Sequence, residues 1–309
     1  MQQTDHIHSG RLAVLALVVA NIALAMGPWL VRIAYTDGHV GPTGSGFWRL
    51  ALAMPILLIA ARAQRTYRPP NMRANMRGVV MTAMLSGLFF AADLGAWHLG
   101  ILHTRLANAT LLGNVTAILF PLYGFIIARS LPSRRQGAAL ALAMVGAMML
   151  LGRSYELSAR NLVGDLLCVF AGICYTAYLV AIDRAQSALG PVRTLTWSVA
   201  AGAPLLLLVA LAFGDPIWPS LWWPLVLMML GSQIVGQGLI LYAVSRVSPL
   251  VVGLMLLIQP VVAAAIGWLF YSERLTIFDL FGGVAIAFAV LLVRETERPL
   301  PAGKISLNA

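Results

Sequence analysis

Long apolar runs alternate with short polar segments along the whole sequence. A bilayer core about 30 Å thick is crossed by about 20 apolar residues in a helix. Ten runs of about this length occur, at residues 12–34, 45–62, 78–101, 105–129, 136–152, 162–182, 192–213, 221–244, 248–271 and 276–293. The pattern predicts an all-α membrane protein with ten transmembrane helices.

Composition supports this reading. Of the 309 residues, 60% are hydrophobic and 10% are charged, whereas a soluble domain carries roughly 25% charged residues. The first run is too long for the core of a signal peptide and follows a polar segment without a basic cluster, so we interpret it as a retained span. Residues 1–11 then form an N-terminal stub and residues 294–309 a tail, both of which we expect in the cytoplasm.

The basic residues indicate an orientation. The chain has 21 basic and 11 acidic residues, but the basic ones cluster between apolar runs and do not line one face, so nucleic acid is not an expected partner. When successive loops and termini are assigned alternately to the two sides of the membrane, one side holds 15 Lys and Arg residues and the other holds five. Arg49 is left inside an apolar run. Because cytoplasmic loops are rich in Lys and Arg, both termini are predicted to be cytoplasmic, in a multi-pass protein of the inner (plasma) membrane.

The sequence lacks the residues that several classes of protein require. The only lysine is Lys304 in the tail, so neither a Walker A lysine nor an intramembrane Schiff-base lysine is present. Cys168 and Cys174 lie six apart inside one apolar run, which suits packing better than a disulfide or a zinc site. No zinc-protease or serine-hydrolase motif and no filter-like segment occurs. We therefore expect no enzyme, no cofactor and no metal, and we consider a channel or an intramembrane enzyme the weaker alternatives.

An internal repeat is visible in the second and seventh runs. Residues 42–55 can be laid over residues 191–204 so that two prolines and a tryptophan coincide, and further along Leu111 aligns with Leu254 at an offset of 143. A chance match between similar compositions is the alternative. Because each half has an odd number of spans, the repeat predicts two five-helix halves of opposite orientation, with a substrate site between them.

The predicted halves, residues 12–152 and 162–293, carry motifs in a characteristic order. They are Phe47-Trp-Arg-Leu-Ala, Ala107-Asn-Ala-Thr-Leu-Leu, Gly164-Asp-Leu-Leu, Ser248-Pro-Leu-Val-Val-Gly with Gln259-Pro260, and Ser272-Glu-Arg-Leu-Thr. In this order the chain resembles the ten-helix EamA-type branch of the drug/metabolite transporter superfamily. The resemblance implies two inverted five-helix repeats around a central cavity, and an exporter of amino acids or other small metabolites. One departure is Arg129-Ser-Leu-Pro-Ser-Arg, where the family usually repeats a Gly/Ser-Glu-Arg turn.

Two charged residues lie well inside predicted spans. At about 1.5 Å per residue, Arg49 is about 8 Å and Asp93 about 12 Å from the outer ends of their helices. A charge at the bilayer centre costs about 2.5 to 3.5 kcal/mol on insertion scales. We therefore expect the two side chains to form an ion pair in the outer half of the cavity, where they bind a zwitterionic substrate. A snorkelling arginine or a purely structural pair is the alternative.

Other polar residues share helix faces with these charges. Trp97 is one turn from Asp93, and His98 follows Trp97 in the same span. Because aspartate and histidine side chains can take up protons, Asp93 and His98 are candidates for proton coupling. A histidine whose hydrogen bonds are satisfied near the membrane interface is the plainer interpretation of His98. Polar stripes occur at Gln233 with Gln237 and at Thr110 with Asn114. The predicted substrate site comprises Arg49, Asp93, Trp97, Asn114, Gln233 and Gln237. The amides serve equally well as links between helices.

These observations favour a secondary active transporter that moves a small polar metabolite outward by alternating access. An amino acid or a related compound is the expected substrate. An importer of a metabolite or a vitamin is the alternative within transport. The expected partners are the substrate and the lipid bilayer, with protons as the candidate coupling ion and a homo-oligomer left open.

The orientation can be tested with single cysteines. A cysteine placed in the loop at residues 63–76 should react with a membrane-impermeant thiol reagent only from the cytoplasmic side. A cysteine placed at residues 214–219 should react only from outside, because the basic loops are retained in the cytoplasm. Labelling with the sides exchanged contradicts the predicted orientation.

Overall fold

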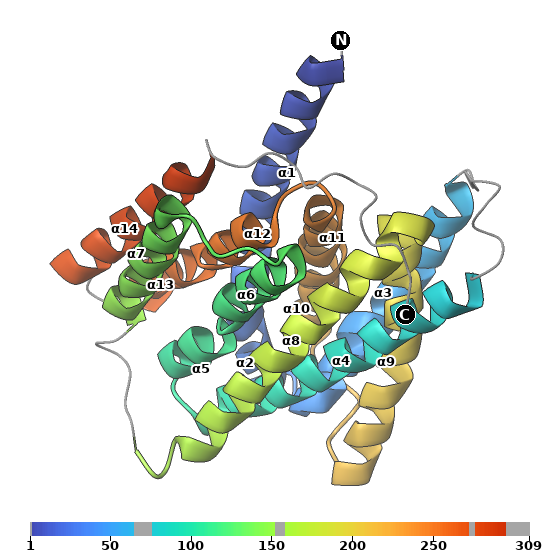
Figure 1. Ribbon diagram of the computed structural model, residues 1–309. Coiled ribbons are helices and arrows are strands. Elements are labelled where there is room, and N and C mark those ends of the chain that lie inside the picture. Colours follow the sequence, from blue (N-terminus) through green and yellow to red (C-terminus); the bar gives the residue numbers. More distant parts are fainter. Residues whose placement is uncertain (1, 65–75, 152–157, 272–275, 295–309) are drawn as a thin grey trace.

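The computed structural model describes residues 2–64, 76–151, 158–271 and 276–294, and within these ranges every regular element is helical. Figure 1 shows the helices. In chain order they are α1 (Gln2–Ala25), α2 (Gly27–Thr36), α3 (Pro42–Ala63), α4 (Met76–His103), α5 (Leu106–Gly113), α6 (Thr116–Ala128), α7 (Arg134–Leu151), α8 (Leu162–Leu189), α9 (Pro191–Phe213), α10 (Trp223–Leu227), the π-helix η2 (Met228–Gln237), α11 (Gly238–Val244), α12 (Pro249–Leu256), α13 (Ile258–Tyr271) and α14 (Ile277–Arg294).

The predicted fold class, an all-α membrane protein, is confirmed. Eight helical segments of the described chain are long and apolar enough to cross a membrane. The shorter helices α7 and α14 coincide with the two remaining apolar runs. Most helix ends fall within a few residues of the predicted ends, because the apolar runs are bounded by polar or glycine-containing loops.

Four of the spans are interrupted, and in two of them a proline explains the break. Pro28 lies in the first turn of α2, and Pro260 lies in the first turn of α13. A proline donates no backbone hydrogen bond, and its ring clashes with the carbonyl four residues earlier. The carbonyls of Leu24 and Leu256, at the ends of α1 and α12, therefore lose their helical donors, and each span divides into two half-helices.

The other two interruptions have no proline at the break. Between α5 and α6, the Thr110 carbonyl accepts from the backbone N–H of Asn114 at 3.3 Å and also from its side-chain amide at 2.7 Å, where α5 ends. In the eighth span the backbone widens into the π-helix η2 before it returns to α-helix at Gly238. π-helical turns are rare and occur frequently at functional sites.

Glycines allow the closest helix contacts. A Cβ added to Gly87 of α4 would lie 2.0 Å from the Ser198 carbonyl oxygen of α9, and one added to Gly100 would lie 2.5 Å from the Cys168 sulfur of α8. The helices α7 and α14 lie side by side at one end of the bundle (Figure 1) and meet at Gly146 and Gly282. In lipid, such small residues let helix backbones approach and gain dispersion contacts.

Most of the main helix contacts join the first predicted half to the second. The pairs include α1 with α11 and η2, α3 with α9 and η2, α4 with α8 and α9, α6 with α12, and α7 with α14. This set of pairs is unchanged when the two halves are exchanged, since the first span pairs with the eighth and the third with the sixth. The pairing agrees with the inverted repeat, which stays a prediction.

We predict that Gly87→Ala lowers the thermal stability of the protein in detergent. The added methyl group meets the backbone of α9, which cannot move away as a flexible side chain can, and such overpacking typically costs about 1 to 3 kcal/mol. Gly137→Ala in α7 is the matched control, because nothing lies within 4 Å of a Cβ at that position. A melting temperature that is the same for both variants contradicts the proposed role of the α4–α9 contact.

Candidate functional site

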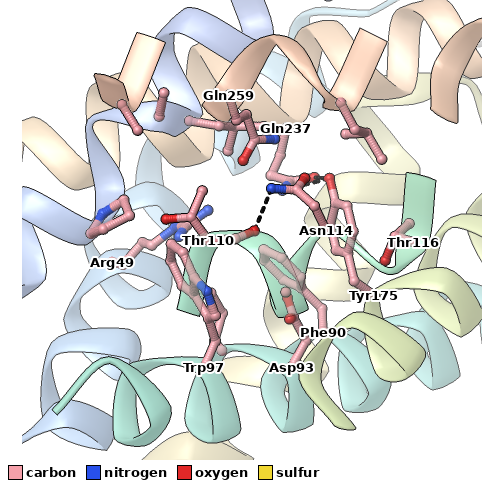
Figure 2. A pocket seen from close by; sticks show the side chains of 17 residues that line it. Arg49, Phe90, Asp93, Trp97, Thr110, Asn114, Thr116, Tyr175, Gln237 and Gln259 are labelled. Atoms are coloured by element: carbon pink, nitrogen blue, oxygen red, sulfur yellow. Dashed lines mark hydrogen bonds between the residues drawn. The ribbon is translucent and has the colours of Figure 1, made fainter. Parts of the chain in front are cut away.

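A central cavity of about 80 Å³ lies among the interrupted helices. Figure 2 shows its side chains. It is lined by Leu24, Ala25, Pro28, Arg49, Phe90, Asp93, Leu94, Trp97, Thr110, Gly113, Asn114, Thr116, Tyr175, Gln237, Leu256, Gln259 and Ala263. This volume is well below the roughly 300 to 1,000 Å³ of pockets for drug-sized ligands. The conformation described here therefore fits only a small molecule.

Every interruption of a span adjoins this cavity. Its lining includes residues on both sides of the α1–α2, α5–α6 and α12–α13 breaks, and the last residue of η2. Three half-helices, α2, α6 and α13, begin at the cavity wall, so their positive N-terminal ends lie near it. Discontinuous helices around a site at the membrane midplane are a recurring feature of secondary transporters.

Arg49 supplies the positive charge of the cavity. It lies in α3 and is 3% exposed. Its Nε donates to Oε1 of Gln233 at 3.2 Å, and its Cζ lies 5.6 Å from the centre of the Phe90 ring. Within the described part of the chain the two Nη nitrogens make no hydrogen bond, and they are not among the fully enclosed polar atoms. They are therefore the donors available to a ligand in the cavity.

Asp93 supplies the negative charge from α4. Its half-buried side chain lines the cavity beside Phe90 and Trp97 (Figure 2). In the described residues it makes no hydrogen bond, and no oxygen of Asp93 lies within 4.0 Å of a nitrogen of Arg49. The predicted direct ion pair is therefore absent from this conformation. The cavity instead presents a positive and a negative group that do not bind each other.

Trp97 and Asn114 face the cavity from neighbouring helices, as predicted. A Cβ at Gly113, the last residue of α5, would lie only 3.1 Å from the indole Nε1 of Trp97. The absence of a side chain at that position therefore lets the indole lie against the α5–α6 break. Asn114 is held by its bond to the Thr110 carbonyl, so an amide at the break also forms part of the cavity wall.

Gln237 is fixed by two tyrosines of α8. The Tyr178 hydroxyl donates to Oε1 of Gln237 at 3.1 Å, and Nε2 of Gln237 donates to the Tyr175 hydroxyl at 3.3 Å. The Tyr178 ring stacks on Phe90 with centroids 4.6 Å apart, and the two tyrosine rings stack at 5.5 Å. These contacts make Phe90 and Tyr175 a rigid aromatic surface, of which both members line the cavity.

Two predicted residues lie outside the cavity lining. Gln233 is fully buried behind Arg49. His98 is also fully buried, and its Nδ1 lies 2.9 Å from the Pro42 carbonyl and 3.0 Å from the Ser45 hydroxyl. His98 thus links α4 to the first turn of α3 through Nδ1, while its Nε2 is enclosed and has no hydrogen-bond partner among the described residues. The geometry leaves Asp93 as the titratable candidate that faces the cavity.

Several lining residues were not in the predicted site, among them Phe90, Thr116 and Gln259. Gln259 donates to Asn21 at 2.9 Å and so connects α13 to α1 beside both breaks. The proline next to Gln259 was a partial signal, since Pro260 lies at a break whereas Pro55 and Pro121 lie inside continuous helices. Phe90 had no signal, because aromatic residues are ordinary in apolar helices.

The arrangement is suited to binding, because the cavity lining offers a cation, an anion, amides and an aromatic surface. Among the described residues no three His, Cys, Asp or Glu side chains come together in a way that could hold a metal ion. Such a site can bind a small molecule that carries both charges.

The comparisons with known proteins agree with the fold. The EamA-like transporter family matches residues 162–294. The chain is 26% identical over 293 residues to the threonine/homoserine exporter RhtA of Salmonella typhimurium (strain LT2), with 94% of each chain covered. It is 22% identical over 288 residues to the uncharacterized transporter YyaM of Bacillus subtilis, covering 89% of this chain and 92% of that one.

One solved structure, described only as the crystal structure of a protein, has the same fold. The TM-score is 0.71 at 17% identity, over 91% of this chain and 97% of that chain. The fold, the central cavity and these relatives define a multi-pass membrane transporter of a small molecule rather than an enzyme. More specifically, residues 162–294 match the EamA-like transporter family, and nearly the whole chain is similar, at low identity, to bacterial transporters.

We predict that Arg49→Ala and Asp93→Asn each lower transport by at least about tenfold, the scale of losing a hydrogen bond to a charged group, while the protein stays folded. Asp183→Asn, a half-buried carboxylate of α8 away from the cavity, is the matched control. The milder pair Arg49→Lys and Asp93→Glu allows a double-mutant cycle. Full additivity removes the claim that the two residues act on one substrate molecule.

Proposed function

We propose that the protein exports a small zwitterion, an amino acid or a related metabolite, across the inner membrane by alternating access. The observation that carries this proposal is the pair of opposite charges that line one small cavity without binding each other. A substrate with a carboxylate and an ammonium group satisfies Arg49 and Asp93 together. Without such a substrate, both charges remain incompletely compensated in a largely apolar bundle.

The remaining lining supports a small amphipathic substrate. Arginine binds carboxylates through two parallel hydrogen bonds, and Asp93 lies where it can accept from an ammonium group. Phe90 and Trp97 present apolar faces to a side chain, while Asn114 and Gln237 offer amides. A bulky lipophilic cation fits less well, since Arg49 repels it. The relatives named as threonine/homoserine exporters favour export and make L-threonine the first compound to test.

Alternating access is supported by the way the half-helices meet. The inner half-helices of the predicted topology, α6 and α12, are packed together. A Cβ at Gly253 would lie 2.5 Å from the Pro121 ring, and one at Gly124 would lie 2.8 Å from the Pro249 ring. The other two half-helices, α5 and α13, barely touch, and the cavity lies between them. The described conformation is therefore closed on the α6–α12 side, and we assign its open side to the exterior.

Secondary active transport by proton exchange extends the proposal. Asp93 is an acid that faces the cavity and makes no hydrogen bond in the described part of the chain. A proton that enters from outside can neutralise it and reduce its hold on the substrate's ammonium group. Release outward and proton uptake would then occur at the same residue.

A counterflow assay in liposomes tests the proposal. Vesicles loaded with an unlabelled amino acid, L-threonine first, should accumulate the labelled compound, while ethidium-like cations should not exchange. A pH gradient that drives protons into the vesicles, imposed at fixed voltage, should change the exchange rate of the wild-type protein. It should leave the exchange rate of Asp93→Asn unchanged. Exchange of cations alone overturns the substrate class. Exchange of a metabolite or vitamin that is not a zwitterion contradicts the roles given to Arg49 and Asp93.

A further inference from the structure

The side chain of Gln233 lies against Arg49 on the side away from the cavity. It is fully buried in η2. Its Oε1 accepts the only hydrogen bond that the Arg49 guanidinium makes to the described protein, from Nε at 3.2 Å. Its Nε2 is enclosed and has no partner among the described residues.

This amide can take only one orientation beside Arg49. If the amide were turned, its NH2 group would face the Nε–H group of Arg49, and two donors would meet. The acceptor must therefore face the guanidinium, which leaves the NH2 group of Gln233 unsatisfied at a cost in stability. An apolar residue of similar size would avoid that cost, so packing alone does not account for a glutamine.

We propose that Gln233 is a positioning residue that orients Arg49 for a carboxylate. By occupying Nε, it turns the two Nη nitrogens toward the cavity, where they can donate a parallel pair of hydrogen bonds to one carboxylate group. Gln233 does not touch the substrate and acts only through Arg49. This inference rests on the proposed function, in which the substrate carries a carboxylate.

The position of the amide depends on the π-helix and on the α1–α2 break. Next to Gln233, the Ser232 hydroxyl donates to the Ala23 carbonyl at 3.5 Å near the end of α1. One turn further on, the Leu24 side chain packs closely against Gly236. A Cβ added to Gly236 would lie 2.9 Å from the Cγ of Leu24. Movement at the break is thereby linked to the orientation of Arg49.

The first test needs no substrate. Phenylglyoxal modifies the guanidinium nitrogens of arginine, and peptide mass spectrometry follows Arg49 alone. Gln233→Met should slow the modification of Arg49 at least about threefold, on the scale of one lost hydrogen bond, because the Nη nitrogens no longer face the cavity. Gln186→Met is the matched control, since Gln186 is a buried glutamine of α8 outside the cavity. An unchanged or faster rate in Gln233→Met overturns the proposal.

A second variant guards against misfolding. Gln233→Asn keeps the amide but retracts it by one methylene, beyond reach of Nε. It should slow modification in the same way if Gln233→Met does not fold. A rate equal to wild type in a folded Gln233→Asn protein contradicts the role of the contact.

Transport kinetics supply a readout that a purely structural role would not change. With L-threonine, Gln233→Met should raise KM at least about tenfold and leave the maximal rate within about twofold of wild type. In an Arg49→Lys background, which has no Nε, the same substitution should have no further effect. An equal rise in both backgrounds overturns the proposal. If wild-type protein exchanges no amino acid, the proposed function fails, and the phenylglyoxal rates still decide the role of Gln233.

Discussion

A single buried cation, Arg49, constrains the architecture around the cavity. A charged side chain at the centre of a membrane costs about 2.5 to 3.5 kcal/mol on insertion scales, and its neighbours must offset that cost. The protein provides one amide, Gln233, one aromatic face, Phe90, and open space in front of the two Nη nitrogens. No carboxylate within 4.0 Å neutralises it among the described residues. Its charge therefore remains available to an anionic group that enters the cavity.

The interrupted helices give this cavity its shape and a means of changing it. Proline breaks two spans, a third is interrupted at Asn114 and a π-helix widens the fourth, and all four interruptions border the same space. A half-helix can tilt about its break without disturbing the other half of its span. In the proposed alternating-access cycle, the packing of α6 on α12 and the separation of α5 from α13 are one end of such a motion. If the halves are related as the sequence predicts, then at the other end of the motion α5 packs on α13 and α6 separates from α12.

Much of the fold was predictable from the sequence, because a ten-run apolar pattern leaves a chain in lipid few alternatives to helices. The bends at Pro28 and Pro260 follow from the missing backbone donor. The break at Asn114 was not predictable, since no proline marks it. The charges at Arg49 and Asp93 were placed in one cavity by depth alone, but depth along a helix does not decide whether two side chains touch.

Gln233 shows a further limit of helical periodicity. A regular α-helix places residues four apart on one face, so Gln233 and Gln237 were both expected to line the cavity. In the wider turns of η2, Gln237 lines it and Gln233 lies behind Arg49. No pattern in the sequence indicates a π-helix, and none indicates the aromatic surface of Phe90 and Tyr175. These features depend on packing between spans that are distant in the sequence.

The central claim is that one cavity opens alternately to the two sides, and disulfide cross-linking across α5 and α13 tests it most directly. At the repeat offset of 143, the Gly253–Pro121 contact corresponds to Thr110 and Ala264. Thr110→Cys with Ala264→Cys, in a protein carrying Cys168→Ser and Cys174→Ser, should cross-link slowly at rest and faster while substrate is transported. The cross-link should stop transport, and reduction should restore it. A cross-link that forms at the same rate with and without substrate, and leaves transport unchanged, contradicts the account.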